Sequence, residues 1–331
     1  MKIVIRGVIL LISILTLFSP TGWGAQTREY IQQIQSGQFT VLEETLTALE
    51  NSREKDTDGM YIFHRTINRI SYDLAKDPES SLDLLNRWVK EKDSYLSHLM
   101  RGLFYAEFAW ADRGGKYANK VLPEAWQSFK ERLALSQQDL EKAASLNAKS
   151  AEPWIGLEMV YRGLSQPEKV DESFQKAVSI DKGHYNAYHM MLIAKMEKWF
   201  GSHEEMFAFA NKSYDEHKDD PVFALLVVEA NDELASRTAL VSGGKRSDYH
   251  TVPVNYNKIK SLLDEVLRVY PKSLKALSWL ATIEYFNGHY SRVLELMDQM
   301  GDDVDEDAWG KKDSYLQTKL WLQKQHAKGV F

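Results

Sequence analysis

LEKAASLN, residues 140–147, recurs in altered form as FQKAVSID, residues 174–181. Lys, Ala and Ser occupy the same places in the two octets, and Leu146 of the first matches Ile180 of the second. The octets begin 34 residues apart. Self-similarity at such a period is typical of chains that grow by stacking small units instead of enlarging one core. The repeat therefore predicts that the chain of 331 residues folds as a stack of small units and not as one exceptionally large domain.

A period of 34 residues is that of the tetratricopeptide repeat, in which each unit is a pair of antiparallel helices. Residues 151–184 fit its template, with Glu158 in the place usually taken by glycine. The fitting positions are apolar or small: Trp154, Leu157, Tyr161, Phe174 and Ala177. Residues 274–300 are a second match, with a turn at Gly288. We predict an all-α fold, a tetratricopeptide-like α-α superhelix built as a solenoid of antiparallel helix pairs.

Local signals mark the starts of several helices. Pro123 suits the first turn of a long helix, because its missing N–H is not needed there. Ser165 with Glu168, and Ser202 with Glu205, have the spacing of a capping box. These signals agree with a helical chain in which turns separate consecutive helices.

Strand patterns are almost absent, and the best one is the short alternating segment 251–256. Residues 236–258 are left open as an ordered excursion or a loop. Tryptophans spaced along the helical segments are expected to pack in the core: Trp88, Trp110, Trp126, Trp154 and Trp199.

Residues 1–24 have the order of a secretory signal peptide. Lys2 and Arg6 precede an apolar run of about eleven residues, which is shorter than the roughly twenty residues that span a bilayer. We expect cleavage before Ala25 and a location in the periplasm. The alternative is that the segment persists as a membrane anchor. The chain contains no cysteine, which excludes disulfides and a lipid-modified cysteine.

The formal net charge is −6, and it becomes −8 once Lys2 and Arg6 are removed with the signal peptide. An acidic chain argues against nucleic acid as a partner, and against an anionic membrane surface. Contact with the membrane is expected only if residues 1–24 are retained.

The glycine pair in WADRGGKYANK, residues 110–120, resembles a phosphate-binding loop only in part. That loop requires GxxxxGK followed by Ser or Thr, whereas Trp110 and Tyr117 stand at two of the required places. Gly114 and Gly115 are instead expected to end one helix before Pro123 begins the next. His203 likewise starts an HExxH zinc motif that Phe207 interrupts.

The acidic stretch 301–313 is a weak calcium candidate. Asp303, Asp305 and Asp307 have the spacing of the first three ligands of a calcium loop. Ala308 occupies the place of the required glycine, and Ser314 that of the bidentate glutamate. The favoured interpretation is an acidic linker before the last helix, with no metal.

A concave face lined by successive first helices is the expected binding surface of such a stack. Positions on that face that the packing does not require form a mixed polar and methionine-bearing groove, suited to a peptide segment. The candidate groove residues are Glu152, Met159, Arg162, Asn186, His189, Met196, Lys275 and Tyr285. The alternative is that they are simply a hydrated helix face.

The stretches 110–117 and 198–210 resemble motifs of a bacterial family known as domain of unknown function 4034. The similarity runs from about Phe39 to Tyr214, and Phe200 stands where the family usually has glycine. The resemblance implies a tetratricopeptide-like helical fold and no assigned activity.

These signals divide the chain into four parts. Residues 1–24 are the signal peptide, and 25–214 are the family-like helical region that contains the unit at 151–184. Residues 215–300 form further helix pairs with the unit at 274–300. Residues 301–331 are expected to be an acidic linker followed by a C-terminal capping helix.

Our leading hypothesis is an exported, non-catalytic helical-repeat protein that binds a protein or peptide in the cell envelope and needs no cofactor. One alternative is a periplasmic enzyme, such as a hydrolase, on an all-helical frame; another is a membrane-tethered assembly factor. No GxSxG elbow occurs in the sequence. A pocket with converging histidine and carboxylate groups would favour the enzyme.

Overall fold

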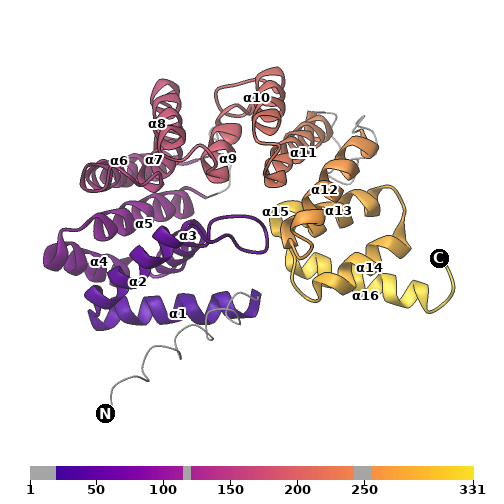
Figure 1. Ribbon diagram of the computed structural model, residues 1–331, viewed down its shortest axis with the longest axis horizontal. Helices are drawn as coiled ribbons and strands as arrows, with labels where there is room; N and C mark the ends of the chain where they lie inside the picture. The colour runs from indigo at the N-terminus through magenta and orange to yellow at the C-terminus, as the bar shows by residue number, and fades with distance from the viewer. Residues whose placement is uncertain (1–19, 115–120, 242–254) are drawn as a thin grey trace, which may run out of the picture. The chain divides into compact units, whose positions relative to one another are not determined.

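The computed structural model describes residues 20–114, 121–241 and 255–331 (Figure 1). Within these ranges the chain forms sixteen α-helices and no β-strand, apart from one isolated bridge between Lys55 and Tyr61. The predicted all-α fold is confirmed. The chain divides into two compact units, one made of residues 1–56 and 60–191 and the other of residues 57–59 and 192–331.

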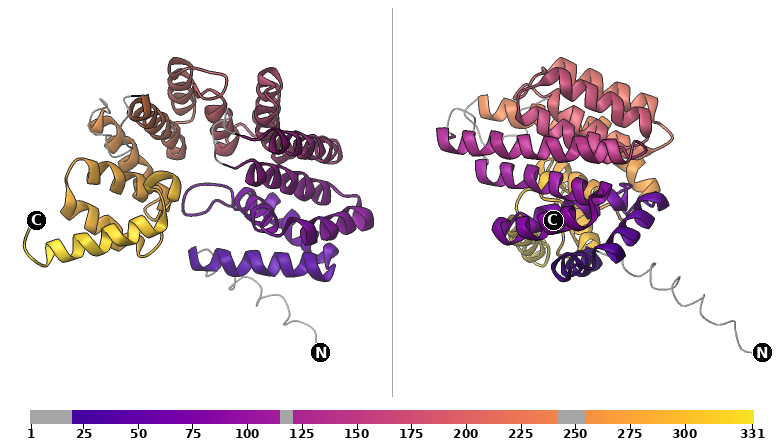
Figure 2. Two further views of the ribbon diagram at one scale, coloured as in Figure 1. Left: turned by 180° about the vertical axis from the view of Figure 1, so that it is seen from behind. Right: turned by 90° about the vertical axis from the view of Figure 1, so that its left-hand side faces the viewer.

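Unit 1 is an array of helices that pack against their neighbours in sequence order, as Figures 1 and 2 show. Its helices are α1 (Pro20–Ser36), α2 (Phe39–Ser52), α3 (Ile62–Leu74), α4 (Pro78–Lys92), α5 (Tyr95–Arg113), α6 (Pro123–Leu146), α7 (Glu152–Gly163), α8 (Pro167–Ile180) and the first part of α9 (Tyr185–Ala194). The strongest packing is between α5 and α6, between α6 and α7, and between α7 and α8.

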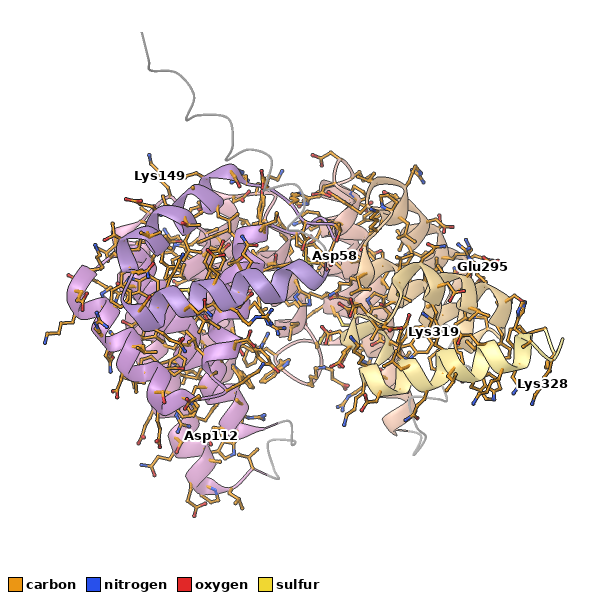
Figure 3. All side chains as sticks on the ribbon, turned by 90° about the horizontal axis from the view of Figure 1, so that it is seen from below. Asp58, Asp112, Lys149, Glu295, Lys319 and Lys328 are labelled. Carbon is orange, nitrogen blue, oxygen red and sulfur yellow. The ribbon has the colours of Figure 1, made fainter. Side chains whose placement is uncertain are left out.

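Unit 2 follows the same plan of consecutive helices in contact. It contains the end of α9, α10 (His203–Glu216), the short 3-10 helix η2 (Pro221–Phe223), α11 (Ala224–Val241), α12 (Tyr256–Val269), α13 (Leu274–Phe286), α14 (Tyr290–Met300), α15 (Glu306–Trp309) and α16 (Lys312–His326). Lys319 of α16, labelled in Figure 3, donates hydrogen bonds to the backbone oxygens of Met297 and Gly301 and so ties α16 to the end of α14.

Both predicted repeat units are helix pairs. Residues 151–184 form α7 and α8, and residues 274–300 form α13 and α14, with Gly288 in the turn between them at φ 76°. Leu157 and Ala177 of the first pair are fully buried. Burying a leucine side chain contributes about 1.5–3 kcal/mol, so the repeat positions stabilise the interface between the two helices.

The predicted helix ends are mostly correct. α6 begins at Pro123, and Ser202 accepts a hydrogen bond from the backbone N–H of Glu205 at 3.1 Å. Gly114 ends α5 with φ 71°, while Gly115 and residues 116–120 lie outside the described residues. The Ser165 cap is wrong. Ser165 has φ 58° in the turn after α7, because Pro167 fits the first position of α8 and fixes the start there.

The tryptophan prediction holds fully only for Trp88, which is 0 % exposed, stacked on Phe39 with ring centroids 5.5 Å apart. The side chains of Trp110, Trp126, Trp154 and Trp199 have intermediate exposure. These four rings therefore lie at the edges of the packed layers, and the prediction of a uniform core stripe is too strong.

At the amino terminus, α1 begins at Pro20, so the expected cleavage position before Ala25 falls inside this helix. Residues 1–19 lie outside the described part. Among the helices that are described, none is both long enough and apolar enough to cross a bilayer. In the open segment 236–258, α11 extends to Val241 and α12 starts at Tyr256, and residues 242–254, which include most of the alternating stretch 251–256, are not described.

Candidate functional site

A buried carboxylate lies between two imidazoles in unit 1. Oε2 of Glu152 is 2.7 Å from Nδ1 of His64, and Oε1 is 3.1 Å from Nε2 of His184. All three residues are at most 7 % exposed. Two imidazoles and one carboxylate thus meet at a point that no metal or catalytic motif in the sequence predicts.

Local structure explains how the three side chains meet. Glu152 is the first residue of α7, where the positive end of the helix dipole favours an acid. His64 is in the first turn of α3, on the same buried face as Ile67 and Ile70. His184 ends the turn between α8 and α9, and its backbone N–H bonds to the carbonyl of Asp181 at 3.2 Å. Three separate elements therefore supply one group each.

Hydrogen bonds define the protons of this cluster. The amide nitrogen of Asn68 lies 3.2 Å from Nε2 of His64 and can only donate, so His64 carries its proton on Nδ1 and donates it to Glu152. His184 donates through Nε2. Nδ1 of His184 is buried and has no hydrogen-bond partner among the described residues. That nitrogen is left with a free lone pair.

Glu152 is ionised despite its burial. Burial raises the pKa of this carboxyl, but the charges of His64 and His184 and their hydrogen bonds more than offset that effect and hold the pKa well below its usual range. Glu152 is therefore an ionised carboxylate whose two imidazole neighbours stabilise it.

A cavity of about 230 Å³ opens beside the cluster, and both Glu152 and His184 line it. Arg53 donates to Asp181 at 2.9 Å and to the hydroxyl of Tyr61 at 2.5 Å, and all three side chains line the same cavity. Lys149, labelled in Figure 3, is an exposed residue of the lining. Polar groups that hydrogen bonds hold in place therefore surround the cavity.

Glu50 is a second half-buried acid in this lining. It accepts hydrogen bonds from the hydroxyl of Tyr95 at 2.9 Å and from Oγ of Ser150 at 2.5 Å. Burial raises the pKa of Glu50, although both of these donors act in the opposite direction. Burial and the neighbouring Glu50 also raise the pKa of Tyr95 well above its usual value. This network fixes the position of the acid at the cavity wall.

The predicted groove residues are mostly not available on an open face. The structure buries Glu152, Arg162, Asn186, Met196 and Lys275 and leaves intermediate exposure at Met159, His189 and Tyr285. Glu152 belongs to the imidazole cluster, and Lys275 forms an ion pair of 2.7 Å with Glu229. The groove prediction requires correction for the five buried residues, because neighbouring helices cover the faces that a minimal repeat would leave open.

The calcium candidate does not assemble. Asp305 caps α15 by accepting a hydrogen bond from the backbone N–H of Ala308 at 3.0 Å, and Asp303 pairs with Lys312 at 2.8 Å. Across the part of the chain that the structure describes, only His64, Glu152 and His184 bring three such ligand atoms within 4.8 Å of one another. Asp307, the third acid, is exposed after the cap.

Sequence reasoning missed His64 and gave Glu152 another role. It did not single out His184, which is buried and pairs with Glu152. The only sequence signal for His64 is a histidine on the apolar face of a helix, which also fits an ordinary core position.

The fold and the cluster together define an all-α helical-repeat protein with a polar pocket at the ends of its helices. No family model matches the chain, and no curated protein is significantly similar to it. The resemblance to domain of unknown function 4034 stays a prediction.

Proposed function

We propose that the chain is an exported helical-repeat protein that binds a protein or peptide of the cell envelope, and that the unit 1 cavity receives one group of that partner. The size of the cavity carries this proposal. About 230 Å³ is smaller than the roughly 300–1,000 Å³ of small-molecule and cofactor sites. A single side chain or a chain terminus fits such a volume, whereas a whole cofactor does not.

Charge favours a cationic group. The lining contains four acids, Glu50, Glu54, Glu152 and Asp181, against two permanent cations, Arg53 and Lys149. Hydrogen bonds already fix most of these groups, which lowers the entropy lost when a partner binds. A lysine or arginine side chain, or a free amino terminus, is the chemical group that this lining complements.

The test uses the full chain and short labelled peptides, with or without lysine and arginine, and with free or acetylated amino termini. Fluorescence anisotropy is expected to show binding that requires a cationic group and that weakens at least tenfold in Asp181→Asn and Glu50→Gln. Glu295→Gln, an exposed acid of unit 2 that pairs with Arg292, is the matched control. Binding that ignores peptide charge, or that both cavity variants retain, would refute the proposal.

A hydrolase is the second candidate, and one observation favours it. His184 lines the cavity and is oriented by a carboxylate, and its buried Nδ1 has no hydrogen-bond partner among the described residues, so a movement that exposes this nitrogen would supply a general base. Turnover of an ester, peptide or phosphate substrate that is lost in His184→Gln would establish this function. Inactivity across such a panel favours the binding protein.

Export and anchoring are tested separately. Mass measurement of the mature amino terminus in the native cell distinguishes a chain that begins at Ala25 from one that keeps residues 1–24. The first result supports a periplasmic protein, and the second supports a membrane-tethered assembly factor.

A further inference from the structure

We propose that His64, Glu152 and His184 bind one divalent cation of the zinc class. Each imidazole supplies one nitrogen and Glu152 supplies one oxygen. Two histidines and one glutamate are a recurrent zinc ligand set, and three protein ligands leave a fourth position for water or substrate. Because Glu152 and His184 line the cavity, a cation at this point is reachable from it.

The distances suit zinc after a small adjustment. Zinc bonds of about 2.0–2.2 Å place tetrahedral ligand atoms roughly 3.3–3.6 Å apart. His64 and His184 contact different oxygens of Glu152, at 2.7 and 3.1 Å, and one ligand atom from each of the three residues lies within 4.8 Å of the others. Side-chain movements of roughly 1 Å therefore open the hydrogen-bonded cluster enough to admit the ion.

The acidic groups around the cluster point to a cation as well. The Glu152 carboxylate is buried against both imidazoles, the Glu50 carboxylate lines the same cavity, and the nearby Arg53 is already paired with Asp181. A divalent cation at this point would balance the negative charge of these carboxylates.

The protons can be accommodated when the ion binds. A ring nitrogen that coordinates zinc gives up its proton, which moves to the other nitrogen of the same ring. In His64 that nitrogen faces the Asn68 amide, which accepts the proton in a hydrogen bond once it turns to present Oδ1, and this turn gives up the bond that the amide donates to the His64 carbonyl at 2.8 Å. In His184 it is Nδ1, where no neighbouring donor opposes a proton. Asn68 is thus a positioning residue for His64.

The experiment is zinc titration of the metal-free full chain by calorimetry, with metal content measured after dialysis. We expect one Zn²⁺ per chain, with affinity reduced at least about 100-fold in His64→Gln, Glu152→Gln and His184→Gln, and about tenfold in Asn68→Ala. Mg²⁺ and Ca²⁺, which prefer sets of oxygen ligands, are expected to bind weakly. The chain has nine histidines, so adventitious binding needs a control.

His289→Gln is that control, because His289 pairs with Glu284 at 2.5 Å but lies in unit 2, outside the proposed ligand set. Its zinc affinity is expected to equal that of the wild type. Circular dichroism checks that each variant folds. If a variant does not fold, X-ray absorption of the wild-type zinc complex decides, and it should show two imidazole ligands.

Zinc binding that is absent, or that survives loss of either His64 or His184, would overturn the proposal. A zinc spectrum without two imidazoles would do the same. The peptide-binding proposal does not depend on this outcome, because its assay runs without zinc and reports on Glu50 and Asp181.

Discussion

Glu158 gives the sharpest prediction about stability. It occupies the place where the repeat template has glycine, it is 1 % exposed, and neither carboxyl oxygen has a hydrogen-bond partner among the described residues. Burial raises the pKa of Glu158 well above its usual value, and the nearby Arg162 only partly opposes this effect. The carboxyl is therefore neutral in the folded protein at a pH where it is ionised in the unfolded chain.

The direction of the pH dependence follows from proton binding. Between the ordinary pKa of 4.5 and the raised pKa, the folded state holds one proton more than the unfolded state. The free energy of unfolding therefore falls as the pH rises through this window, by about 1.4 kcal/mol per pH unit for this group. Below the ordinary pKa both states are protonated, and the loss disappears.

Glu158→Gln removes this titration while keeping the shape of the side chain. As the pH rises above 5 within this window, the variant should gain about 1.4 kcal/mol per pH unit in the free energy of unfolding relative to the wild type. Urea unfolding at a series of pH values, followed by circular dichroism, measures the difference, in which all other titrating groups cancel. Glu172→Gln, an exposed acid on α8, should leave the pH dependence as in the wild type. A difference for Glu158→Gln that stays constant with pH would mean that Glu158 is ionised and paired with Arg162, and would refute the reasoning.

Three further stability predictions can be checked by denaturant unfolding. Trp88→Ala should lower the free energy of unfolding by about 3–5 kcal/mol, because the ring is fully buried and its Nε1 donates to Glu43 at 2.8 Å. Trp154→Ala should have a smaller effect, because this ring is partly exposed, and an equal effect would contradict that exposure. Ser202→Ala should cost about 1 kcal/mol through loss of the α10 cap, and no change would show that the cap is dispensable. Lys275→Met should cost about 3–5 kcal/mol by removing the cation that pairs with the buried Glu229, whereas adding Glu229→Leu should restore much of the loss; additive losses would show that the pair is not the cause.

The fold was predictable because its signals are local. A 34-residue period, a proline at the start of α6 and a serine cap at α10 each act within one or two helix turns of their own position. Stacked repeats contact mainly their sequence neighbours, so local signals specify most of the architecture. Where two local signals compete, the stronger backbone constraint decides: Pro167 starts α8, and Ser165 is left in the turn.

The candidate site was not predictable in the same way. His64 and His184 are joined through Glu152, and the shorter of the two sequence separations is 32 residues, that between Glu152 and His184. Their meeting depends on how α3, α7 and the turn before α9 pack, which periodicity does not encode. The repeat template also placed Glu152 on an open face. The template describes an isolated helix pair and does not include α3, whose His64 contacts Glu152.

Glu152 and Glu158 show why burial alone does not identify a functional group. Both are glutamates of α7, six residues apart, and both are at most 5 % exposed. Glu152 lies at the positive end of the helix and has two imidazole partners, so its pKa falls; Glu158 lies further along, without a hydrogen-bond donor among the described residues, so its pKa rises. The first arrangement keeps Glu152 ionised, which suits a cation. The second keeps Glu158 neutral in the folded protein, which lowers the free energy of unfolding at a pH where the unfolded chain ionises this group. Zinc should therefore stabilise the folded chain through Glu152, and Glu158→Gln should leave zinc affinity unchanged.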